Sequence, residues 1–206
     1  MSGQLPVLLA LLQHWQLNDA HIVAHDIGGA VAQQLGIFHP ERIRSLTLID
    51  CVSYDSWPSK RTREQMAAGL EKLIAADDQT HRAHFREWIL SATHHPTELA
   101  SGSLETYLSM ISGPVGQTSL FQHQIMHYDP DYTAKLVDQY HELGALPVQL
   151  IWGADDAWQV VDWAHRLHET IPGSALHILD DCGHLVMEDQ PDQLSRLVKS
   201  FIPAAP

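Results

Sequence analysis

The sequence predicts an α/β fold with a mostly parallel sheet of about four strands and a large helical insertion between the second and third strands. Three observations lead to this prediction. Short apolar runs alternate with helical patterns near both ends of the chain, whereas the middle carries helical patterns and no convincing strand. The 206 residues, 45% of them hydrophobic, can also bury one large core. We therefore expect one globular unit.

The first part of the chain predicts a helix, strand, helix, strand succession. Apolar spacing indicates an amphipathic helix over residues 5–17. Residues 21–33 form a short apolar strand, a turn at Asp26 and the start of a helix, which Pro40 stops after residue 39. Residues 43–49 then predict a second buried strand that ends at Asp50. Such a unit needs a parallel crossover.

The rest of the chain divides into a helical stretch and a return to alternation. Between residues 53 and 144 the periodicity predicts only helices, over 63–76, 81–92, 104–111, 119–128 and 132–143. Strands follow at 148–152 and 175–179, with helices at 161–170 and 191–201. The predicted core thus comprises residues 1–52 and 145–206.

Composition limits the classes of partner. A formal charge of -13 repels phosphate backbones and anionic lipid, so we expect neither nucleic acid nor membrane as a partner, but a small-molecule substrate. No segment resembles a secretory signal or a membrane span, which predicts a cytoplasmic protein with Cys51 and Cys182 reduced. His94 and His95 lack further ligands at metal-binding spacing, so we expect no metal and no cofactor.

The turn at Asp26 carries the strongest chemical signal. The pattern from Ala24 to Gly28, small-x-nucleophile-x-small, is that of a nucleophile elbow, where a strained turn after a strand needs small neighbours. Most such elbows carry Ser, but this one carries Asp. A carboxylate is ionised at neutral pH and needs no base to become a nucleophile. It suits displacement at an alkyl carbon better than acyl transfer.

Two later segments add a candidate acid and a candidate base. Asp155 and Asp156 come directly after the third predicted strand, and His184 follows the fourth. Loops after parallel strands gather at the carboxyl edge of the sheet, where ligands bind in open α/β folds. The chain order nucleophile, acid, histidine is that expected of α/β-hydrolases. Each element alone is a weak signal, but three in this order are a strong one.

On these residues the sequence resembles the α/β-hydrolase superfamily, in particular its aspartate-nucleophile branch of haloalkane dehalogenases and epoxide hydrolases. The resemblance rests on His-Asp-Ile-Gly-Gly at the elbow, the segment 39–50 after it, Trp-Gly-Ala-Asp-Asp at the acid strand and Gly-His at the base. It implies that residues 53–144 form the family's helical cap. It also implies hydrolysis of a small apolar electrophile, an epoxide or alkyl halide, through an alkyl-enzyme ester.

The resemblance implies a role for each site residue. Asp26 would attack the substrate carbon, His184 would activate water, and Asp156 would orient the imidazolium. Ile27 and Gly28 would belong to the elbow and the oxyanion-binding site. Two alternatives for the acid remain open, namely Asp155 and, at the end of the second strand, Asp50.

The substrate is less well determined. Many haloalkane dehalogenases place a halide-binding Trp directly after the nucleophile, where this chain has Ile27. Epoxide hydrolases use cap tyrosines as acids, and four tyrosines lie in the predicted cap: Tyr107, Tyr128, Tyr132 and Tyr140. An apolar pocket lined by Trp57, Trp88 and Trp158 is expected, although core packing explains these residues equally well.

The family's elbow strand is an internal strand, yet only about 20 residues precede it here. We therefore expect an N-terminally truncated sheet whose elbow strand is an open edge that invites pairing with another chain as a homo-oligomer. Two hypotheses remain. Either the recorded start is an internal methionine of a longer, active enzyme, or the short form is a catalytically impaired remnant that acts as a binding or self-associating module.

Overall fold

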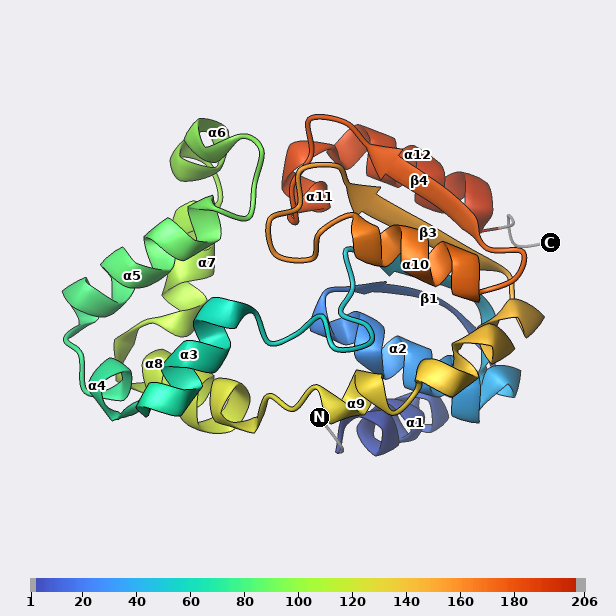
Figure 1. Ribbon diagram of the computed structural model, residues 1–206, viewed down its shortest axis with the longest axis horizontal. Coiled ribbons are helices and arrows are strands. Elements are labelled where there is room, and N and C mark those ends of the chain that lie inside the picture. Colours follow the sequence, from blue (N-terminus) through green and yellow to red (C-terminus); the bar gives the residue numbers. More distant parts are fainter. Residues whose placement is uncertain (1–2, 203–206) are drawn as a thin grey trace.

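The computed structural model describes residues 3–202 and contains a parallel four-stranded sheet with helices packed on both faces (Figure 1). The strands lie in chain order: β1 (Ala20–His25), β2 (Ile43–Ile49), β3 (Val148–Gly153) and β4 (Ala175–Leu179). This confirms the predicted fold class. Within the described residues β1 pairs with β2 alone, so β1 is an edge strand.

The two central strands form the middle of the core. Every residue of β3 is buried, as are all but one of β2, whereas β1 is only half-buried. One face of the sheet is covered by α1 (Gln4–His14), α2 (Ile27–Phe38) and α10 (Asp162–Thr170). The other face packs against α12 (Pro191–Phe201), which follows the short helix α11 (Val186–Asp189). This three-layer packing buries the β2 and β3 side chains on both sides.

The chain between β2 and β3 contains only helices, and we call residues 53–144 the helical insertion. Its α-helices are α3 (Lys60–Ala68), α4 (Glu71–Ile74), α5 (Asp78–Leu90), α6 (Pro96–Ser101), α7 (Leu104–Ile111), α8 (Gly113–Ser119) and α9 (Asp131–Ala134). Most of them gather beside the sheet (Figure 1) around a second hydrophobic cluster centred on Phe85 and Phe121.

Several predicted helices of the insertion are shorter in the structure. The predicted helix 63–76 divides at Gly69, whose φ of 87° is incompatible with a helix. Residues 119–128 form a π-helical turn, η2 (Leu120–Gln124), and a 3-10 turn, η3 (Ile125–His127), after α8. Residues 132–143 form α9 and the 3-10 segment η4 (Val137–Ala145). Apolar periodicity shows which face is buried and does not separate these helix types.

Three short α-helices were not predicted, namely α6, α8 and α11. Each is too short to show a repeated apolar face.

The last part of the insertion packs against the sheet. Tyr140 and Leu143 of η4 lie in the core of the sheet layer and not in the cluster around Phe85.

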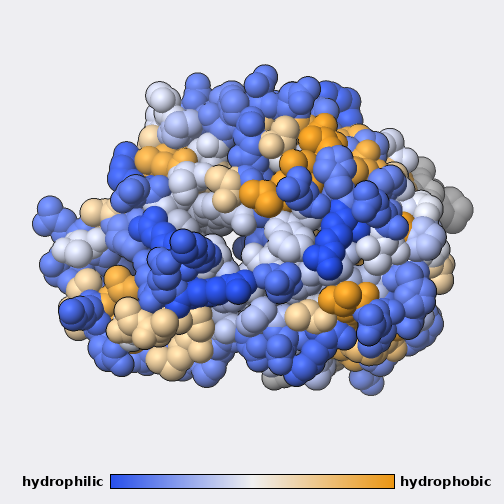
Figure 2. All heavy atoms as spheres, in the orientation of Figure 1, coloured by the Kyte–Doolittle hydropathy of each residue, from blue (hydrophilic) through white to orange (hydrophobic). Residues whose placement is uncertain are grey.

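The surface is mainly hydrophilic on the face shown in Figure 2, with scattered apolar patches and a hollow between the insertion and the sheet layer. This agrees with the large excess of acidic side chains. Among residues 3–202, none of the helices has both the length and the apolar character needed to cross a membrane.

Candidate active site

Asp26 lies in the tight turn between β1 and α2. Its φ of 48° is in the left-handed region, which is strained for a residue with a side chain. Backbone hydrogen bonds hold it there: its N–H donates to the carbonyl of Ile49, and its own carbonyl accepts from Val52 at 3.2 Å and from Gly29 at 2.9 Å. The neighbouring strand thus enforces the turn and presents the carboxylate at the carboxyl edge of the sheet.

The small residue that this turn requires is Gly29. A Cβ there would lie 2.2 Å from the Cβ of Cys51, so α2 could not approach the residues after β2. The sequence pattern predicted that Ala24 and Gly28 are the positions that must be small. For Gly28 this prediction was wrong, because a Cβ there would meet nothing within 4 Å. The pattern names positions along the chain, whereas the steric contact depends on which residue of α2 faces Cys51.

The structure brings Asp26, Asp156 and His184 together. Nδ1 of His184 lies 2.8 Å from Oδ2 of Asp156, and Nε2 lies 3.9 Å from Oδ1 of Asp26. The imidazole is 1% exposed, and its Nε2 has no hydrogen-bond partner among the described residues. The ring is therefore fixed by Asp156 on one side and directed towards Asp26 on the other.

The carboxylate of Asp156 is held in place by several hydrogen-bond donors. Its Oδ1 accepts the backbone N–H groups of Trp158 at 2.7 Å and Gln159 at 2.8 Å, while Oδ2 faces His184. Asp155, an alternative acid in the sequence, points elsewhere. It is half exposed and pairs with Nδ1 of His94 at 2.8 Å. The geometry thus pairs Asp156, and not Asp155, with His184.

The charges of the three groups are strongly linked. Burial opposes the charged form of His184, but the hydrogen bond to Asp156 and the negative charges of Asp156 and Asp26 outweigh it and raise its pKa to about 10. For Asp26, burial acts to raise the pKa, but the close approach and positive charge of His184 lower it overall. In the resting state the site therefore holds an imidazolium between two carboxylates.

Asp50, the third candidate acid, also lies in this cluster. It follows β2, is fully buried, and accepts the backbone N–H of Gly153 at 2.9 Å. Burial, and next the charge of Asp156, raise its pKa well above the ordinary value. The side-chain partner of Nδ1 of His184 is Asp156, and no hydrogen bond joins Asp50 to His184 among residues 3–202.

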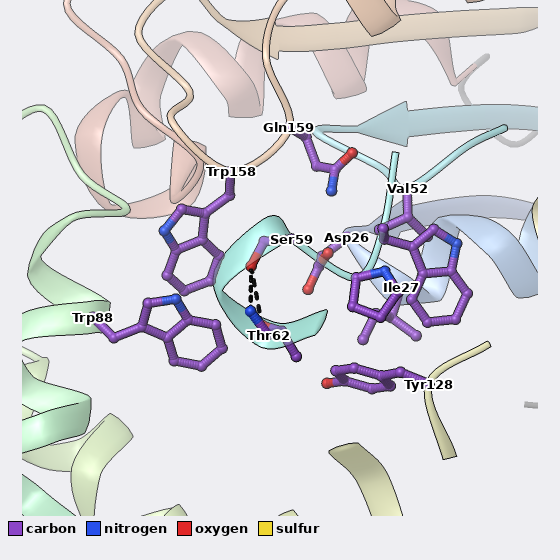
Figure 3. A pocket seen from close by; sticks show the side chains of 11 residues that line it. Asp26, Ile27, Val52, Ser59, Thr62, Trp88, Tyr128, Trp158 and Gln159 are labelled. Atoms are coloured by element: carbon purple, nitrogen blue, oxygen red, sulfur yellow. Dashed lines mark hydrogen bonds between the residues drawn. The ribbon is translucent and has the colours of Figure 1, made fainter. Parts of the chain in front are cut away.

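A small, mainly apolar cavity opens in front of Asp26 (Figure 3). Its volume of about 60 Å³ leaves space for on the order of five water-sized groups. It lies between the elbow, the residues after β2 and β3, and the helical insertion. Its lining residues are Asp26, Ile27, Val52, Trp57, Pro58, Ser59, Thr62, Trp88, Tyr128, Trp158 and Gln159. Gly28 is not among them and lies in a groove beside β1.

The three expected tryptophans all line this cavity. Trp88 of α5 stacks on Trp158, with ring centroids 4.5 Å apart, and Trp158 lies 5.0 Å from the His184 ring (Figure 3 shows the two indoles together). Two indole N–H groups already donate to protein oxygens, Trp57 to Thr133 at 2.7 Å and Trp158 to Ser91 at 3.1 Å. These two are thus not free to bind a leaving group.

Of the four tyrosines predicted to lie in the cap, only Tyr128 lines the cavity. Its hydroxyl oxygen accepts a hydrogen bond from Gln124 at 3.0 Å, which leaves the hydroxyl proton free to be donated. The hydroxyl points towards the space before Asp26 (Figure 3). Burial, followed by the charge of Asp26, raises its pKa to about 12, so it stays protonated at neutral pH. Tyr107 and Tyr140 instead bond within the protein.

Two residues that the sequence analysis did not single out hold the loop of His184. His25 Nε2 contacts the carbonyl oxygen of His184 at 2.9 Å. Asp189 accepts the backbone N–H groups of Gly183 at 2.7 Å and His94 at 2.9 Å, and also the hydroxyl of Thr93. Asp189 thereby joins the helical insertion to the histidine loop. Its position in a short helix carried no sequence signal.

The chain's family follows from a comparison with known families. The sequence model of the protein family described as "Alpha/beta hydrolase family" matches residues 4–197. This match spans the sheet, the insertion and all three residues of the triad arrangement. The chain belongs to the alpha/beta hydrolase family. The match does not distinguish an aspartate-nucleophile branch within it.

Relatives within this family are distant. The uncharacterized hydrolase YugF of Bacillus subtilis is 23% identical over 95% of this chain and 70% of its own length. A 2-hydroxy-6-oxononadienedioate/2-hydroxy-6-oxononatrienedioate hydrolase of Pseudomonas is 23% identical over 90% of this chain and 64% of its own length. The chain thus spans about two thirds of these relatives.

The fold also matches solved structures. An alpha/beta hydrolase fold protein from Burkholderia ambifaria superposes with a TM-score of 0.87 at 26% identity, covering 96% of this chain and 71% of that one. This likeness supports the sheet and insertion described above and does not name a substrate.

Proposed function

We propose that this protein is a hydrolase that opens a small apolar epoxide or displaces an alkyl halide, with Asp26 as the nucleophile and a covalent aspartyl ester as the intermediate. The observation that carries the proposal is Asp26 itself. An ionised carboxylate stands at the strained elbow, 3.9 Å from the imidazole of a buried histidine, and faces a cavity of aromatic side chains.

Each step uses groups at this site. An Asp26 oxygen attacks the substrate carbon and forms a C–O bond, while the halide leaves or the epoxide C–O bond breaks. Water then attacks the carbonyl carbon of the ester, with His184 Nε2 taking its proton. The tetrahedral intermediate collapses to release the alcohol, which takes that proton from His184, and leaves Asp26 as a carboxylic acid. Asp26 then passes its remaining proton to the neutral His184, which restores the carboxylate and the resting imidazolium. Asp156 orients the ring throughout through its contact with Nδ1.

The charge balance of the site fits this order of events. The Asp26 carboxylate is one of the charges that raise the pKa of His184 to about 10. Ester formation neutralises Asp26 and removes that charge, so the pKa of His184 falls. The imidazole then loses its proton more readily and can act as a base when the ester is present.

The cavity favours an uncharged substrate. None of its lining residues, all within the described chain, is a Lys or Arg, and Asp26 supplies a negative charge. A dianion of the kind that names the Pseudomonas relative would be repelled here. Aromatic walls instead favour a small apolar molecule.

Tyr128 favours the epoxide over the halide. Its hydroxyl proton is free to be donated to an epoxide oxygen as the ring opens. A halide site would need donors beside the nucleophile, but Ile27 follows Asp26, and the indole N–H groups of Trp57 and Trp158 are engaged. We therefore expect epoxides to react faster than halides.

The test is to trap the ester. A His184→Ala variant should accumulate the intermediate when given a panel of small epoxides and alkyl halides, because water is no longer activated. Mass spectrometry of the peptide containing Asp26 should show the full mass of the epoxide, or the alkyl group less one proton for a halide.

An Asp26→Asn variant of the same protein serves as the control and should carry no adduct. If no member of the panel modifies Asp26 in folded His184→Ala protein, the proposed chemistry is wrong.

Replacing Tyr128 by Phe tests its role as an acid. Epoxide turnover should fall roughly 10²- to 10⁴-fold, the usual contribution of a general acid, whereas ester formation with an alkyl halide should persist. Tyr132→Phe is the matched control, because Tyr132 lies outside the cavity lining. Equal epoxide rates in Tyr128→Phe and the native protein would remove Tyr128 from the mechanism.

A second candidate function is self-association through β1, and it is favoured by the exposure of that edge. β1 pairs on one side only among residues 3–202, and Val23 is 45% exposed. An apolar edge with unpaired N–H and C=O groups can pair with a second copy of the chain.

A further inference from the structure

The carboxyl group of Asp50 is buried with one of its oxygens unused. Its side chain is fully inaccessible to solvent. Oδ1 accepts the Gly153 N–H at 2.9 Å, but Oδ2 has no hydrogen-bond partner in the part of the chain that the structure describes. A buried ionised oxygen without a hydrogen-bond donor is energetically costly, so an ionised Asp50 is disfavoured in this environment.

Asp50 and Asp156 meet at Gly153, whose N–H donates to Asp50 and whose carbonyl accepts the N–H of Asp156 at 3.3 Å, so the carboxyl of Asp156 is the side chain to which Asp50 can hydrogen-bond. Two carboxylates cannot form a hydrogen bond unless one of them carries a proton. Asp156 already accepts two backbone N–H groups on Oδ1, and its Oδ2 faces Nδ1 of the His184 imidazole. Asp50 accepts one N–H only. A single proton between the two groups therefore belongs on Asp50.

We propose that Asp50 is a neutral carboxylic acid that donates a hydrogen bond from Oδ2 to Asp156 and so positions the acid of the triad. Asp50 is then a positioning residue, since it acts on His184 only through Asp156. The inference assigns an atom-level role within the proposed triad and in that sense rests on the proposed function.

The other groups around Asp50 are consistent with this assignment. The titratable neighbours that act on it are Asp156 and His184, and the thiols of Cys51 and Cys182 also lie nearby. Burial is the main cause that raises the pKa of both thiols, so they stay neutral. Two groups favour an ionised Asp50, the His184 imidazolium and the Gly153 N–H, and the imidazolium is paired directly with Asp156. One proton on Asp50 leaves the cluster with two negative charges, on Asp26 and Asp156, and one positive.

Infrared spectroscopy tests the proton directly and needs no substrate. With aspartate labelled at its carboxyl carbon, the native protein near neutral pH should show a protonated C=O band that shifts with the label. Asp50→Asn should lose this band. Asp155→Asn, the matched control one residue from Asp156, should keep it. A native protein without the band, or an Asp50→Asn protein that retains it, would overturn the assignment.

A second readout reports on positioning. The amide of Asp50→Asn can still donate to Asp156, so the low-field proton signal of His184 Nδ1–H in NMR spectra should persist, whereas Asp50→Ala should shift or broaden it. Identical signals in both variants would show that Asp50 does not hold Asp156. If Asp50→Asn fails to fold, carbon NMR of the labelled native protein decides instead, because the proposal requires one aspartate with a protonated carboxyl shift near neutral pH.

These results are separate from those of the trapping experiment. Absence of an Asp26 adduct contradicts the hydrolase chemistry, and the carboxyl band still reports whether Asp50 carries the proton.

Discussion

At the residue scale, the charged groups of the site lie close together, and the charge of each one affects the protonation of its neighbour. His184 is almost fully buried and can hold a positive charge only because Asp156 and Asp26 flank it. Nε2, the atom that would take a proton from water, has no hydrogen-bond partner within residues 3–202. The ion pairs that position the imidazole for the proposed chemistry therefore also make the free energy of unfolding depend on pH.

Stability should fall as the pH rises above neutrality. The pKa of His184 is raised from 6.5 to about 10, so its contribution is fully present below about pH 6.5 and is lost as the pH rises through about 10. One proton gives a slope of at most about 1.36 kcal/mol per pH unit in the free energy of unfolding. Urea unfolding between these pH values measures it.

A His184→Gln variant should show a much shallower slope. His123→Gln, which replaces an exposed histidine of η2, should keep the native one. Parallel slopes in the native protein and His184→Gln would mean that the ion pairs do not hold the imidazolium.

At the element scale, the elbow depends on how closely α2 approaches the end of β2. The strained φ of Asp26 persists because backbone hydrogen bonds from both β2 and its following loop enforce it. The close contact that permits this approach lies between Gly29 and Cys51. Gly29 is one residue after Gly28, the position that the sequence pattern indicates.

Adding a methyl group at Gly29 should therefore be destabilising. Gly29→Ala forces a clash with the backbone-proximal Cβ of Cys51, and overpacking of this kind costs about 1–3 kcal/mol. Gly28→Ala, one residue away in the same helix, meets nothing and should be neutral or stabilising by up to about 1 kcal/mol. Thermal unfolding of the two variants compares them, and equal midpoints would contradict the steric explanation.

At the scale of the whole molecule, the cavity exists only where the helical insertion meets the sheet layer. Trp88 comes from the insertion and Trp158 from the loop after β3, and their stack closes the cavity over His184. Asp189 joins the two parts at the histidine loop. At the first position of the sheet order, β1 pairs with a strand on one side only among residues 3–202.

Self-association through this edge should respond to charge. Val23→Lys places a cation on the exposed face of β1, so the mass measured by light scattering at micromolar concentration should fall towards that of a monomer. Val115→Lys adds the same charge on α8, where Val115 is 83% exposed, and should leave the mass unchanged. A native protein that is already monomeric would rule out the edge as an interface.

The sequence alone determined the fold class, the strands and the triad candidates. Strand runs such as residues 43–49 are continuous in sequence, and loops after parallel strands must meet at one edge of a sheet. Local patterns were therefore sufficient to bring Asp26, Asp156 and His184 together. They could not separate Asp156 from Asp155 or Asp50, because the three differ in direction and burial and not in residue type.

Only the tertiary structure decided the remaining features. It selected Tyr128 from four tyrosines, assigned the close approach to Gly29, and brought Asp50 and Asp156 together at Gly153. Each of these depends on contacts between segments far apart in the chain, whose distances are set by packing. A local pattern shows which residues can do the chemistry, and packing decides which of them lie within reach of one another.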